Sequence, residues 1–380
     1  MAGLYREAAD RASSQGASIS IGGRALVNFA SNDYLGLAGH EALVLASQKA
    51  ARDFGSGAGA ARLLAGGTGL HAALEHKAAW FADAPAALLF NSGYHANTGA
   101  IPALAARGDL ILSDELNHAS IIDGCRLSKA DTLIYRHADT AHLRNLLEGP
   151  DGKGRRRKLI VTESVFSMDG DIAPLPALRE LAAEHGAILY MDEAHAIGVL
   201  GGGRGGLRHF GLSGGRNDGG PPIVLMGTFS KALGSYGAFV AADRGTIDWL
   251  RNTARTFIFS TALPPGPAGA ALAALKLFEE GTGGELVGKL WENRQIFFDG
   301  LLKAGFETGP TRTPIVPVLF GGIQEALRAA DGLLAAGFYA PAIRPPTVKR
   351  PRLRLQVSAA HSRDDLDRLL SALKNRENRR

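Results

Sequence analysis

Three reactive side chains follow the ends of two apolar runs in the middle of the chain. Asp192 and His195 come directly after the run Ala187–Met191, and Lys231 comes shortly after the run Ile223–Met226. Apolar runs of this length are typical of buried strands. Ligands of an open α/β sheet bind beyond the carboxyl ends of its strands. We therefore expect an aspartate, a histidine and a lysine to face one crevice.

Two further apolar runs lead to polar side chains in the same way. Leu110–Leu112 is followed by His118, and Lys158–Thr162 is followed by Ser167. Thr228 stands three residues before the lysine. The same edge of the sheet is thus expected to carry a second histidine and two hydroxyl groups.

This combination of side chains predicts chemistry on pyridoxal phosphate. A lysine amine such as that of Lys231 bonds to the cofactor aldehyde when burial or a nearby cation lowers its pKa. An aspartate such as Asp192 keeps the pyridine nitrogen protonated, so that the ring withdraws electrons from the substrate α-carbon. The turn Asn91–Tyr94 precedes a helical stretch and offers backbone N–H groups to the phosphate.

Each of these residues also has a simpler interpretation, which the sequence leaves open. Asp192 is of a type that caps helices, His195 could serve packing alone, and Lys231 could be a surface lysine. Asp192, Glu193 and His195 could together bind a metal ion, but neighbours on a strand point to opposite faces, so we expect no metal site. Gly55–Ala60 fits the dinucleotide-binding pattern of a nicotinamide-dependent dehydrogenase, although the helical stretch before it disfavours this alternative.

The composition favours a folded protein with a large core. Of the 380 residues, 46% are hydrophobic and 21% are charged, which excludes intrinsic disorder as the main state. Basic residues are not interleaved with aromatic ones, so nucleic-acid binding has little support. The net charge of +5 suits an anionic small molecule or an acyl carrier. We expect the cationic run Arg155–Lys158 to be a solvated loop.

Cysteine usage and hydropathy bear on the cellular compartment. Cys125 is the single cysteine, which excludes an intramolecular disulfide and favours a reducing, cytoplasmic location. The N-terminus has no apolar signal core, and no stretch of about eighteen apolar residues exists. We therefore expect neither a secretory leader nor a membrane span.

Apolar runs alternate with helical stretches through the middle of the chain. This alternation predicts an α/β fold around a central, mainly parallel sheet. The seven expected strands are Ala87–Phe90, Leu110–Leu112, Thr132–Tyr135, Lys158–Thr162, Ala187–Met191, Ile223–Met226 and Ala238–Ala241.

We predict three parts of the chain: an N-terminal arm over residues 1–45, a large domain over 46–268, and a smaller α+β domain over 269–380. The arm should hold a helical piece and then a β segment at Arg24–Phe29. The glycine-rich stretch Gly201–Pro222 should be an exposed loop. The strands and helices expected in the small domain are Ile315–Leu319, Ile323–Ala336, Arg352–Val357 and Arg363–Leu373.

Six stretches match, in order, the motifs of one enzyme family. They are Ser31–Leu37, Asn117–Ser120, Thr162–Asp171, Asp192–His195, Thr228–Lys231 and Ser260–Pro265. In these stretches the chain resembles the α-oxoamine synthases, from about residue 28 to about residue 370. The resemblance implies the type I fold of pyridoxal-phosphate enzymes, with a seven-stranded sheet in the large domain and pyridoxal 5'-phosphate as the cofactor.

The resemblance also implies roles for four residues around the cofactor ring. Lys231 would hold the cofactor covalently and later act as the general base. Asp192 would contact the pyridine nitrogen, and His195 would contact the 3-hydroxyl group. His118 would stack on the face of the ring and assist proton transfer.

Five further residues would bind oxygen atoms or line the cofactor, according to the same resemblance. Ser167 and Thr228 would bind cofactor or substrate oxygens, and backbone groups of Gly93 and Tyr94 would line the cofactor. Many relatives have phenylalanine where Tyr94 stands. Thr261 would reach the phosphate of a neighbouring subunit, which implies a homodimer with its active sites at the interface.

Substrate roles follow from the C-terminal part of the resemblance. Arg354 would bind the carboxylate of the amino acid, Asn32 and Thr347 would contact substrate, and Arg6 is the candidate for an N-terminal substrate arginine. The segment Ala342–Val348 resembles the family members that serve biotin biosynthesis. It implies decarboxylative condensation of L-alanine with a pimeloyl thioester carried on coenzyme A or on an acyl-carrier protein.

Three alternatives to this function stay open on the sequence. Within the family, the chain could be a glycine C-acetyltransferase or another α-oxoamine synthase. Outside the family, it could be the dehydrogenase considered above. It could also be a non-catalytic regulatory subunit, but the presence of Lys231, Asp192 and His118 argues against a subunit without chemistry.

Overall fold

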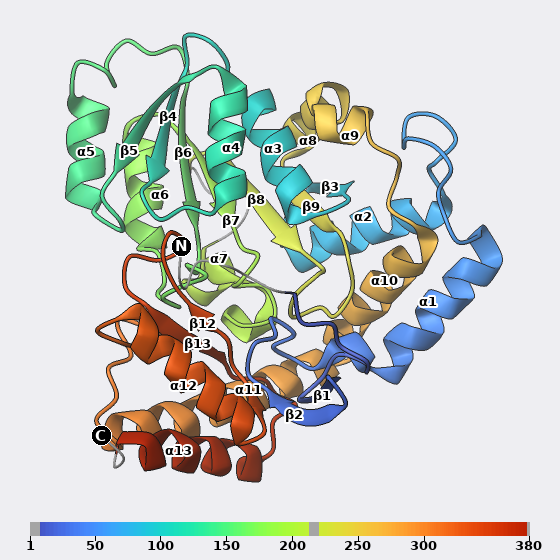
Figure 1. Ribbon diagram of the computed structural model, residues 1–380. Coiled ribbons are helices and arrows are strands. Elements are labelled where there is room, and N and C mark those ends of the chain that lie inside the picture. The colour runs from blue at the N-terminus through green and yellow to red at the C-terminus, as the bar shows by residue number, and fades with distance from the viewer. Residues whose placement is uncertain (1–7, 213–219, 378–380) are drawn as a thin grey trace. The chain divides into compact units, whose positions relative to one another are not determined.

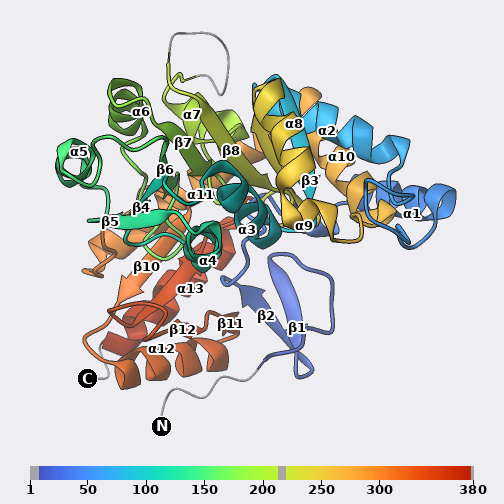
Figure 2. The same cartoon turned by 90° about the horizontal axis from the view of Figure 1, so that it is seen from above.

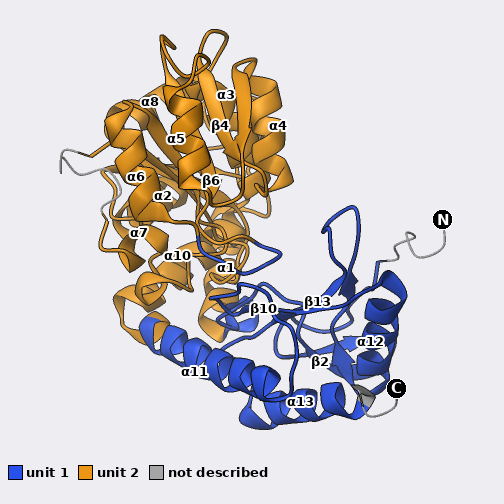
Figure 3. Ribbon diagram, turned by 90° about the vertical axis from the view of Figure 1, so that its left-hand side faces the viewer, with its two compact units in different colours: residues 1–40, 167–172, 284–380 blue, residues 41–166, 173–283 orange. Residues whose placement is uncertain are grey.

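The computed structural model describes residues 8–212 and 220–377. The chain divides into two compact units (Figure 3). Unit 1 comprises residues 1–40, 167–172 and 284–380, and unit 2 comprises residues 41–166 and 173–283. These bounds differ from those of the predicted arm, large domain and small domain, since the N-terminal residues group with the C-terminal ones. The division into three domains stays a prediction.

The described part of unit 2 is built around a seven-stranded sheet (Figure 1). Its strands are β3 (Ala86–Phe90), β4 (Leu110–Asp114), β5 (Asp131–Tyr135), β6 (Lys158–Glu163), β7 (Ile188–Asp192), β8 (Ile223–Thr228) and β9 (Ala238–Ala242). The strand order is β3-β9-β8-β7-β6-β4-β5, in which only the pairs made by β9 are antiparallel. The predicted mainly parallel sheet is therefore confirmed, strand by strand.

Helices cover both faces of this sheet, with α3 and α4 on one face and α6 on the other (Figure 2). The helices are α1 (Glu41–Phe54), α2 (Gly69–Phe81), α3 (Gly93–Leu104), α4 (Ala119–Ser128), α5 (Thr140–Glu148), α6 (Leu175–Glu184), α7 (Gly206–His209), α8 (Arg244–Thr253), α9 (Arg255–Ile258) and α10 (Pro265–Glu279). Ala96, Ile101, Ile121, Cys125 and Leu250 of α3, α4 and α8 belong to one buried apolar cluster with the sheet. Coverage on both faces explains why the strands are continuously apolar.

The stretch Gly201–Pro222, expected to be an exposed loop, is buried at Gly203 and at residues 205–207, whereas residues 208–211 are exposed. It contains a short 3-10 helix, Gly201–Gly203, and then α7. The Glu193 carboxylate accepts hydrogen bonds from the backbone N–H groups of Gly206 (2.8 Å) and Leu207 (3.2 Å), which fixes the start of α7. Residues 213–219 of the stretch lie outside the described residues.

The cationic run Arg155–Lys158 is not simply solvated, as the sequence suggested. Arg156 makes a bidentate pair with Asp109, at 2.9 and 3.0 Å. Arg155 pairs with Asp131, and the Arg157 side chain donates to the carbonyl of Leu104. These residues lead into β6, so their side chains meet the loops at the amino end of the sheet.

The described part of unit 1 contains two small three-stranded sheets and three long helices. One sheet has the order β1-β2-β11 and the other the order β10-β13-β12. The elements are β1 (Ser18–Ile21), β2 (Arg24–Asn28), β10 (Ile315–Leu319), β11 (Phe338–Tyr339), β12 (Ala342–Ile343), β13 (Arg352–Gln356), α11 (Thr282–Lys303, which begins in unit 2), α12 (Ile323–Ala335) and α13 (Arg363–Glu377). Phe29, Phe297, Val316, Leu353 and Leu366 lie in its apolar core.

The secondary structure predicted for the C-terminal part is confirmed, whereas the N-terminal helix is not. Residues 8–17 contain no helix, and the chain instead enters the hairpin of β1 and β2. Residues 1–7 lie outside the described residues. Within the described part of the chain, no helix has the length and hydropathy needed to cross a bilayer.

Candidate active site

The carboxyl ends of β7 and β8 bring Lys231 and His195 together. The two strands are parallel neighbours, with Asp192 paired to Met226. Each strand then continues into a short turn that carries one of the two side chains. The Lys231 Nζ atom lies 2.9 Å from the His195 Nε2 atom. This contact places an amine and an imidazole at the edge where ligands of such sheets bind.

Asp192 ends β7 as a buried carboxylate with two donors. Its Oδ1 atom accepts the backbone N–H of Ala194 at 2.9 Å, and its Oδ2 atom accepts the Asn97 side-chain amide at 2.8 Å. Asn97 lies in α3 and is fully buried. The carboxylate is thus held in one orientation by a strand end and by a helix on one face of the sheet.

A chain of hydrogen bonds continues from Asn97 to His118. The Asn97 Nδ2 atom lies 2.8 Å from the Ser120 Oγ atom, and that oxygen lies 2.8 Å from the His118 Nδ1 atom. The backbone N–H of Ser120 also donates to the same nitrogen at 3.2 Å. His118 is therefore the N-cap of α4, while the residue as a whole is exposed.

Burial and two nearby charges change the pKa of His118. Desolvation by the surrounding protein is the main cause that lowers the pKa of His118, and the positive charge of Lys231 lowers it further. The negative charge of Asp192 acts in the opposite direction. Because both charges act on one imidazole, the three side chains share one electrostatic environment.

Glu163, at the end of β6, is a buried carboxyl beside this group. Burial raises its pKa well above the usual range, and the charge of Asp192 raises it further. The charge of Lys231 and a hydrogen bond from the backbone of His118 oppose that rise. We therefore expect Glu163 to be a neutral acid that anchors the main chain at His118.

Hydroxyl groups and a helix start lie on the neighbouring segments of unit 2. The Thr228 Oγ1 atom donates to the carbonyl of Gly237 at 3.0 Å and lies 2.7 Å from the Ser230 Oγ atom. Gly93 is the first residue of α3, where backbone N–H groups have no partner within the helix. Tyr94 is exposed, and its hydroxyl donates to the Asp123 carboxylate on α4.

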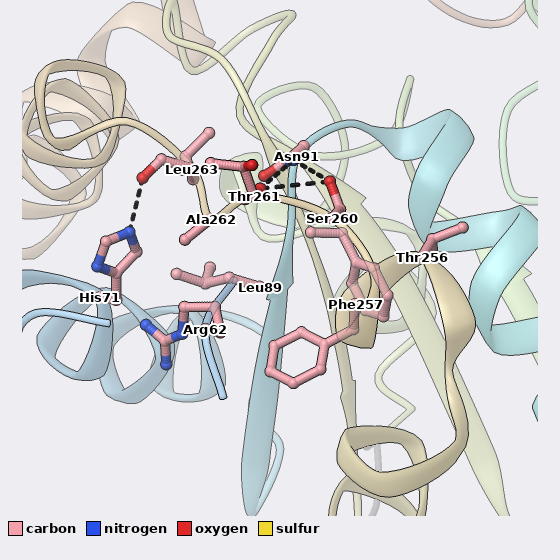
Figure 4. Close-up of a pocket in the computed structure, with 11 residues that line it drawn as sticks. Arg62, His71, Leu89, Asn91, Thr256, Phe257, Ser260, Thr261, Ala262 and Leu263 are labelled. Atoms are coloured by element: carbon pink, nitrogen blue, oxygen red, sulfur yellow. Dashed lines mark hydrogen bonds between the residues drawn. The ribbon is translucent and has the colours of Figure 1, made fainter. Parts of the chain in front are cut away.

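Thr261 lies in the segment between α9 and α10, which Figure 4 shows beside a small pocket. The Asn91 amide donates to the Thr261 carbonyl at 2.7 Å and to the Ser260 Oγ atom at 2.8 Å. His71 contacts the Leu263 carbonyl at 2.7 Å. The pocket measures about 10 Å³, which is room for one water molecule and not for a cofactor. These contacts fix the backbone and leave Thr261 exposed.

A second group of predicted site residues lies in unit 1. The Arg354 guanidinium donates to the Asn32 Oδ1 atom from both terminal nitrogens, at 3.2 Å each, and to the Ser167 carbonyl. It also donates to the Tyr34 hydroxyl group. These acceptors are neutral, so they orient the guanidinium without cancelling its charge. Thr347 is exposed on the loop after β12.

One predicted site residue, Arg6, lies outside the described residues, so its role stays a prediction. Among the residues that the structure describes, no group of three or more His, Cys, Asp and Glu side chains is arranged to hold a metal ion. The Asp192–Glu193 pair shows the reason, since Asp192 faces α3 whereas Glu193 faces Ser164 and the start of α7.

Comparisons with known proteins identify the family. The class I and II aminotransferase family matches residues 24–373. An 8-amino-7-oxononanoate synthase of Symbiobacterium thermophilum is 46% identical over 98% of this chain and 93% of its own. The enzyme of that name from Geobacter sulfurreducens is 47% identical over 98% of this chain and 94% of its own. The chain belongs to the 8-amino-7-oxononanoate synthase family. Its predicted place among the α-oxoamine synthases is confirmed.

Solved structures agree with the membership of this family. A serine palmitoyltransferase from S. paucimobilis, determined with bound PLP and myriocin, matches with a TM-score of 0.91 and 30% identity, over 98% of this chain and 92% of its own. The 8-amino-7-oxononanoate synthase of Francisella tularensis matches with a TM-score of 0.79 and 29% identity, over 93% of this chain and 98% of its own. The predicted type I fold is confirmed.

The donor set of unit 2 fits pyridoxal phosphate, the cofactor of this family. It combines the Lys231 amine, the buried Asp192 carboxylate and the His195 imidazole with nearby hydroxyl groups. Gly93 adds the backbone N–H groups at the start of α3. An amine, a carboxylate, an imidazole and phosphate donors are the groups that this cofactor needs.

By contrast, the glycine-rich stretch Gly55–Ala60 lacks the context of a dinucleotide site. It follows α1, a helix of fourteen residues, whereas the dinucleotide fingerprint follows a strand. The dehydrogenase alternative depended on a dinucleotide-binding site in this stretch, and the helix that precedes the stretch removes that support.

Four residues of this family member were missed by reasoning from the sequence: Asn97, Ser120, Glu163 and Ser230. Ser120, Glu163 and Ser230 stand inside the quoted motifs but received no role. Asn97 precedes the mostly small and apolar residues 99–104 of its helix, and a polar residue beside such a run is a signal of a buried hydrogen bond. The signal was present, but the partner of Asn97 could not be read from it.

Proposed function

We propose that this chain condenses L-alanine with a pimeloyl thioester, releasing carbon dioxide and the free thiol, to form 8-amino-7-oxononanoate for biotin biosynthesis. The proposal is carried by the contact of Lys231 with His195 at the strand ends where Asp192 lies, in a chain that matches synthases of this name over nearly its whole length. When bound, pyridoxal phosphate supplies an aldehyde for amines and a ring that withdraws electrons from the substrate α-carbon.

Lys231 has two tasks in this reaction. Its Nζ atom binds the cofactor before alanine arrives and, once displaced, removes the α-proton of alanine as a general base. The His195 Nε2 atom lies 2.9 Å from the same nitrogen and restricts the positions that the amine can take. After carbon dioxide has left, Nζ is the group from which a proton returns to the product carbon.

Asp192 and His118 are proposed to act on the charges of the cofactor ring and of the substrate. The Asp192 carboxylate, buried and held by two donors, favours a proton on the ring nitrogen opposite to it, as a fixed charge does in a desolvated site. His118 keeps its Nδ1 atom engaged with Ser120 and is exposed, so its Nε2 atom is the one that can reach a substrate oxygen. These roles follow the family resemblance and stay proposals.

Arg354 is the proposed binding group for the alanine carboxylate. A guanidinium fork suits bidentate pairing with a carboxylate. The Asn32 amide oxygen and the Ser167 carbonyl, both in unit 1, accept hydrogen bonds from this fork and orient it. Thr347 and Arg6 are proposed to contact the remainder of the substrates.

We propose that the active chain is a homodimer in which Thr261 serves the neighbouring subunit. The backbone of Thr261 pairs with Ala61, and the turn that follows Ala61 presents Leu63 and Leu64 to solvent, with exposed fractions of 51% and 81%. Apolar side chains exposed to this degree next to a site residue support a subunit contact.

Thiol release by the purified holoenzyme tests the reaction. L-Alanine with pimeloyl-CoA or pimeloyl-acyl-carrier protein should release thiol and carbon dioxide in equal amounts, and comparison of the two donors identifies the carrier. Lys231→Ala is the matched control and should release none through this route. Faster release with glycine and acetyl-CoA would instead identify a glycine C-acetyltransferase and contradict the proposal.

A further inference from the structure

The side chains of Tyr190, Asn97, Ser120 and His118 form one continuous set of hydrogen bonds that begins at Asp192. Asn97 and Ser120 are buried to 0% and 1% exposure, and they lie on α3 and α4, which pack closely. An added Cβ atom at Gly124 of α4 would lie 2.8 Å from the Asn97 carbonyl oxygen, so the two helices have little room to shift. The set of bonds is therefore rigid.

We propose that Asn97 and Ser120 are positioning residues that hold His118 as a neutral imidazole with its proton on Nε2. This inference deepens the proposed function and rests on it, because it concerns how His118 is prepared for the reaction. Neither residue needs to touch substrate or cofactor for this purpose.

The direction of each bond near Asp192 follows from which atoms can donate. A carboxylate can only accept, so the Asn97 atom at 2.8 Å from Asp192 must be the amide nitrogen. The Asn97 Oδ1 atom then faces Tyr190, whose hydroxyl must donate to it at 2.7 Å. The second hydrogen of the Asn97 amide is left for Ser120.

The remaining bonds lead to His118. The Ser120 Oγ atom accepts from Asn97, so its single hydrogen is available for the His118 Nδ1 atom at 2.8 Å. The backbone N–H of Ser120 points at the same atom. A nitrogen that accepts two hydrogen bonds carries no proton, and the proton of the neutral ring therefore lies on Nε2.

Charged and titratable groups from three strand ends act on His118. The charges of Asp192 on β7 and Lys231 after β8 act on its ring, and Glu163 at the end of β6 is hydrogen-bonded to its backbone. Hydrogen bonds to Nδ1 stabilise the neutral form, which agrees with the lowered pKa of His118. In this state His118 offers an N–H donor from Nε2 and has no free base at Nδ1.

Nitrogen-15 spectra of protein labelled at histidine test the tautomer directly. In the wild-type holoenzyme without substrates, His118 should show an unprotonated Nδ1 and a protonated Nε2 between pH 7 and 8, with its signals assigned through His118→Gln. The opposite tautomer, or a protonated ring over this range, would overturn the proposal. Apart from the assignment, this measurement needs no substitution at Asn97 or Ser120.

Variants at Ser120 separate positioning from simple helix capping. Ser120→Ala should raise the pKa of His118 and mix its tautomers, and kcat should fall about tenfold while KM changes less than about twofold. Ser120→Thr keeps the hydroxyl group and should restore both. Ser128→Ala is the matched control, because Ser128 is a buried serine of the same helix whose Oγ atom donates to the Cys125 carbonyl at 2.6 Å.

The outcomes distinguish this inference from the proposed function. If Ser120→Ala leaves the tautomer and the pKa of His118 unchanged, while its thermal midpoint falls as it does in Ser128→Ala, the residue is merely structural and the inference is wrong. If the tautomer is as proposed but no thiol is released from pimeloyl thioesters, the inference holds and the assigned reaction fails.

Discussion

At the scale of single residues, neighbouring carboxyl groups differ because their surroundings differ. Asp192 and Glu193 are adjacent and both buried, yet they face opposite ways. Asp192 meets Asn97 and the edge of the sheet, where a ligand can reach it. Glu193 accepts three hydrogen bonds, from Gly206, Leu207 and Ser164, and burial raises its pKa to about 7. Of these two carboxyl groups, only that of Asp192 is proposed to take part in the reaction.

Replacement of the Asp192 charge should separate cofactor binding from proton removal. Asp192→Asn keeps the size of the side chain, and Lys231 remains to bind the cofactor. Exchange of the α-hydrogen of alanine with deuterated water should fall by about 10²–10³-fold, as expected when a preorganised charge is lost from a desolvated site.

The measurement is proton NMR of alanine incubated with the holoenzyme, with cofactor content followed by absorbance. Asp139→Asn, at the N-cap of α5, is the control for a lost carboxylate elsewhere and should exchange at the wild-type rate. Exchange by Asp192→Asn at near the wild-type rate would contradict the role of Asp192.

At the scale of elements, the turns that follow strands have two roles. They carry candidate functional residues, and their side chains also make contacts that hold a unit together. His361 lies in the turn between β13 and α13 of unit 1. Its Nδ1 atom accepts the Ser358 N–H at 3.1 Å, so its Nε2–H donates to the carbonyl of Asn28 on β2 at 3.0 Å. The ring stacks on Phe29 at 4.1 Å. One neutral imidazole thus joins the turn before α13 to the end of β2.

This imidazole should make unit 1 sensitive to acid. Burial lowers the pKa of His361 from 6.5 to about 4, so the unfolded chain binds a proton more readily than the folded one below pH 6.5. The stabilising contribution is present above pH 6.5 and is lost as the pH falls towards 4. Between pH 7 and pH 5 the free energy of unfolding should fall by about 2 kcal/mol from this residue.

Urea unfolding of the wild type and of His361→Gln at pH 7 and pH 5 measures this contribution. Glutamine can still donate and accept but does not titrate, so the variant should lose less stability over this range. His76→Gln, at an exposed position of α2, is the control substitution. Equal losses in wild type and His361→Gln would contradict the argument.

At the scale of the whole molecule, the proposed role of Thr261 bears on how many chains make one active site. Its backbone is fixed by Asn91 and Ala61, whereas the residue itself is exposed beside the apolar turn at Leu63 and Leu64. If Thr261 serves a neighbouring subunit, two inactive variants can complement each other. If it serves its own chain, they cannot.

Co-refolded mixtures of Lys231→Ala and Thr261→Ala should therefore regain activity. In a mixed dimer one site carries both substitutions and the other carries neither, so an equal, randomly paired mixture should reach about a quarter of the wild-type activity. Thiol release from pimeloyl thioester measures it, with each variant refolded alone as the control. No gain on mixing would contradict the shared site.

Much of the fold could be predicted because its signals are local. The seven strands of unit 2 are short apolar runs bounded by turns, and β4, β6 and β8 were found within one or two residues of their observed ends. The stretch Gly201–Pro222 was in part misjudged, because Gly206 within it donates its backbone N–H to the buried Glu193 carboxylate. Glycine content predicts turns, but it does not show whether a turn is buried.

Hydrophobic periodicity located the strand ends at which Lys231, Asp192 and His195 lie, because that pattern is carried by neighbouring residues. The side chains found there predicted the cofactor, and the resemblance of six short motifs implied the family. Which groups bind each other became visible only in the folded chain. Asn97 and Asp192 are 95 residues apart, and their bond depends on how α3 packs on the sheet. Such long-range packing sets the side-chain hydrogen bonds. The direction of each hydrogen bond between Asp192 and His118 could therefore be read only from the folded chain.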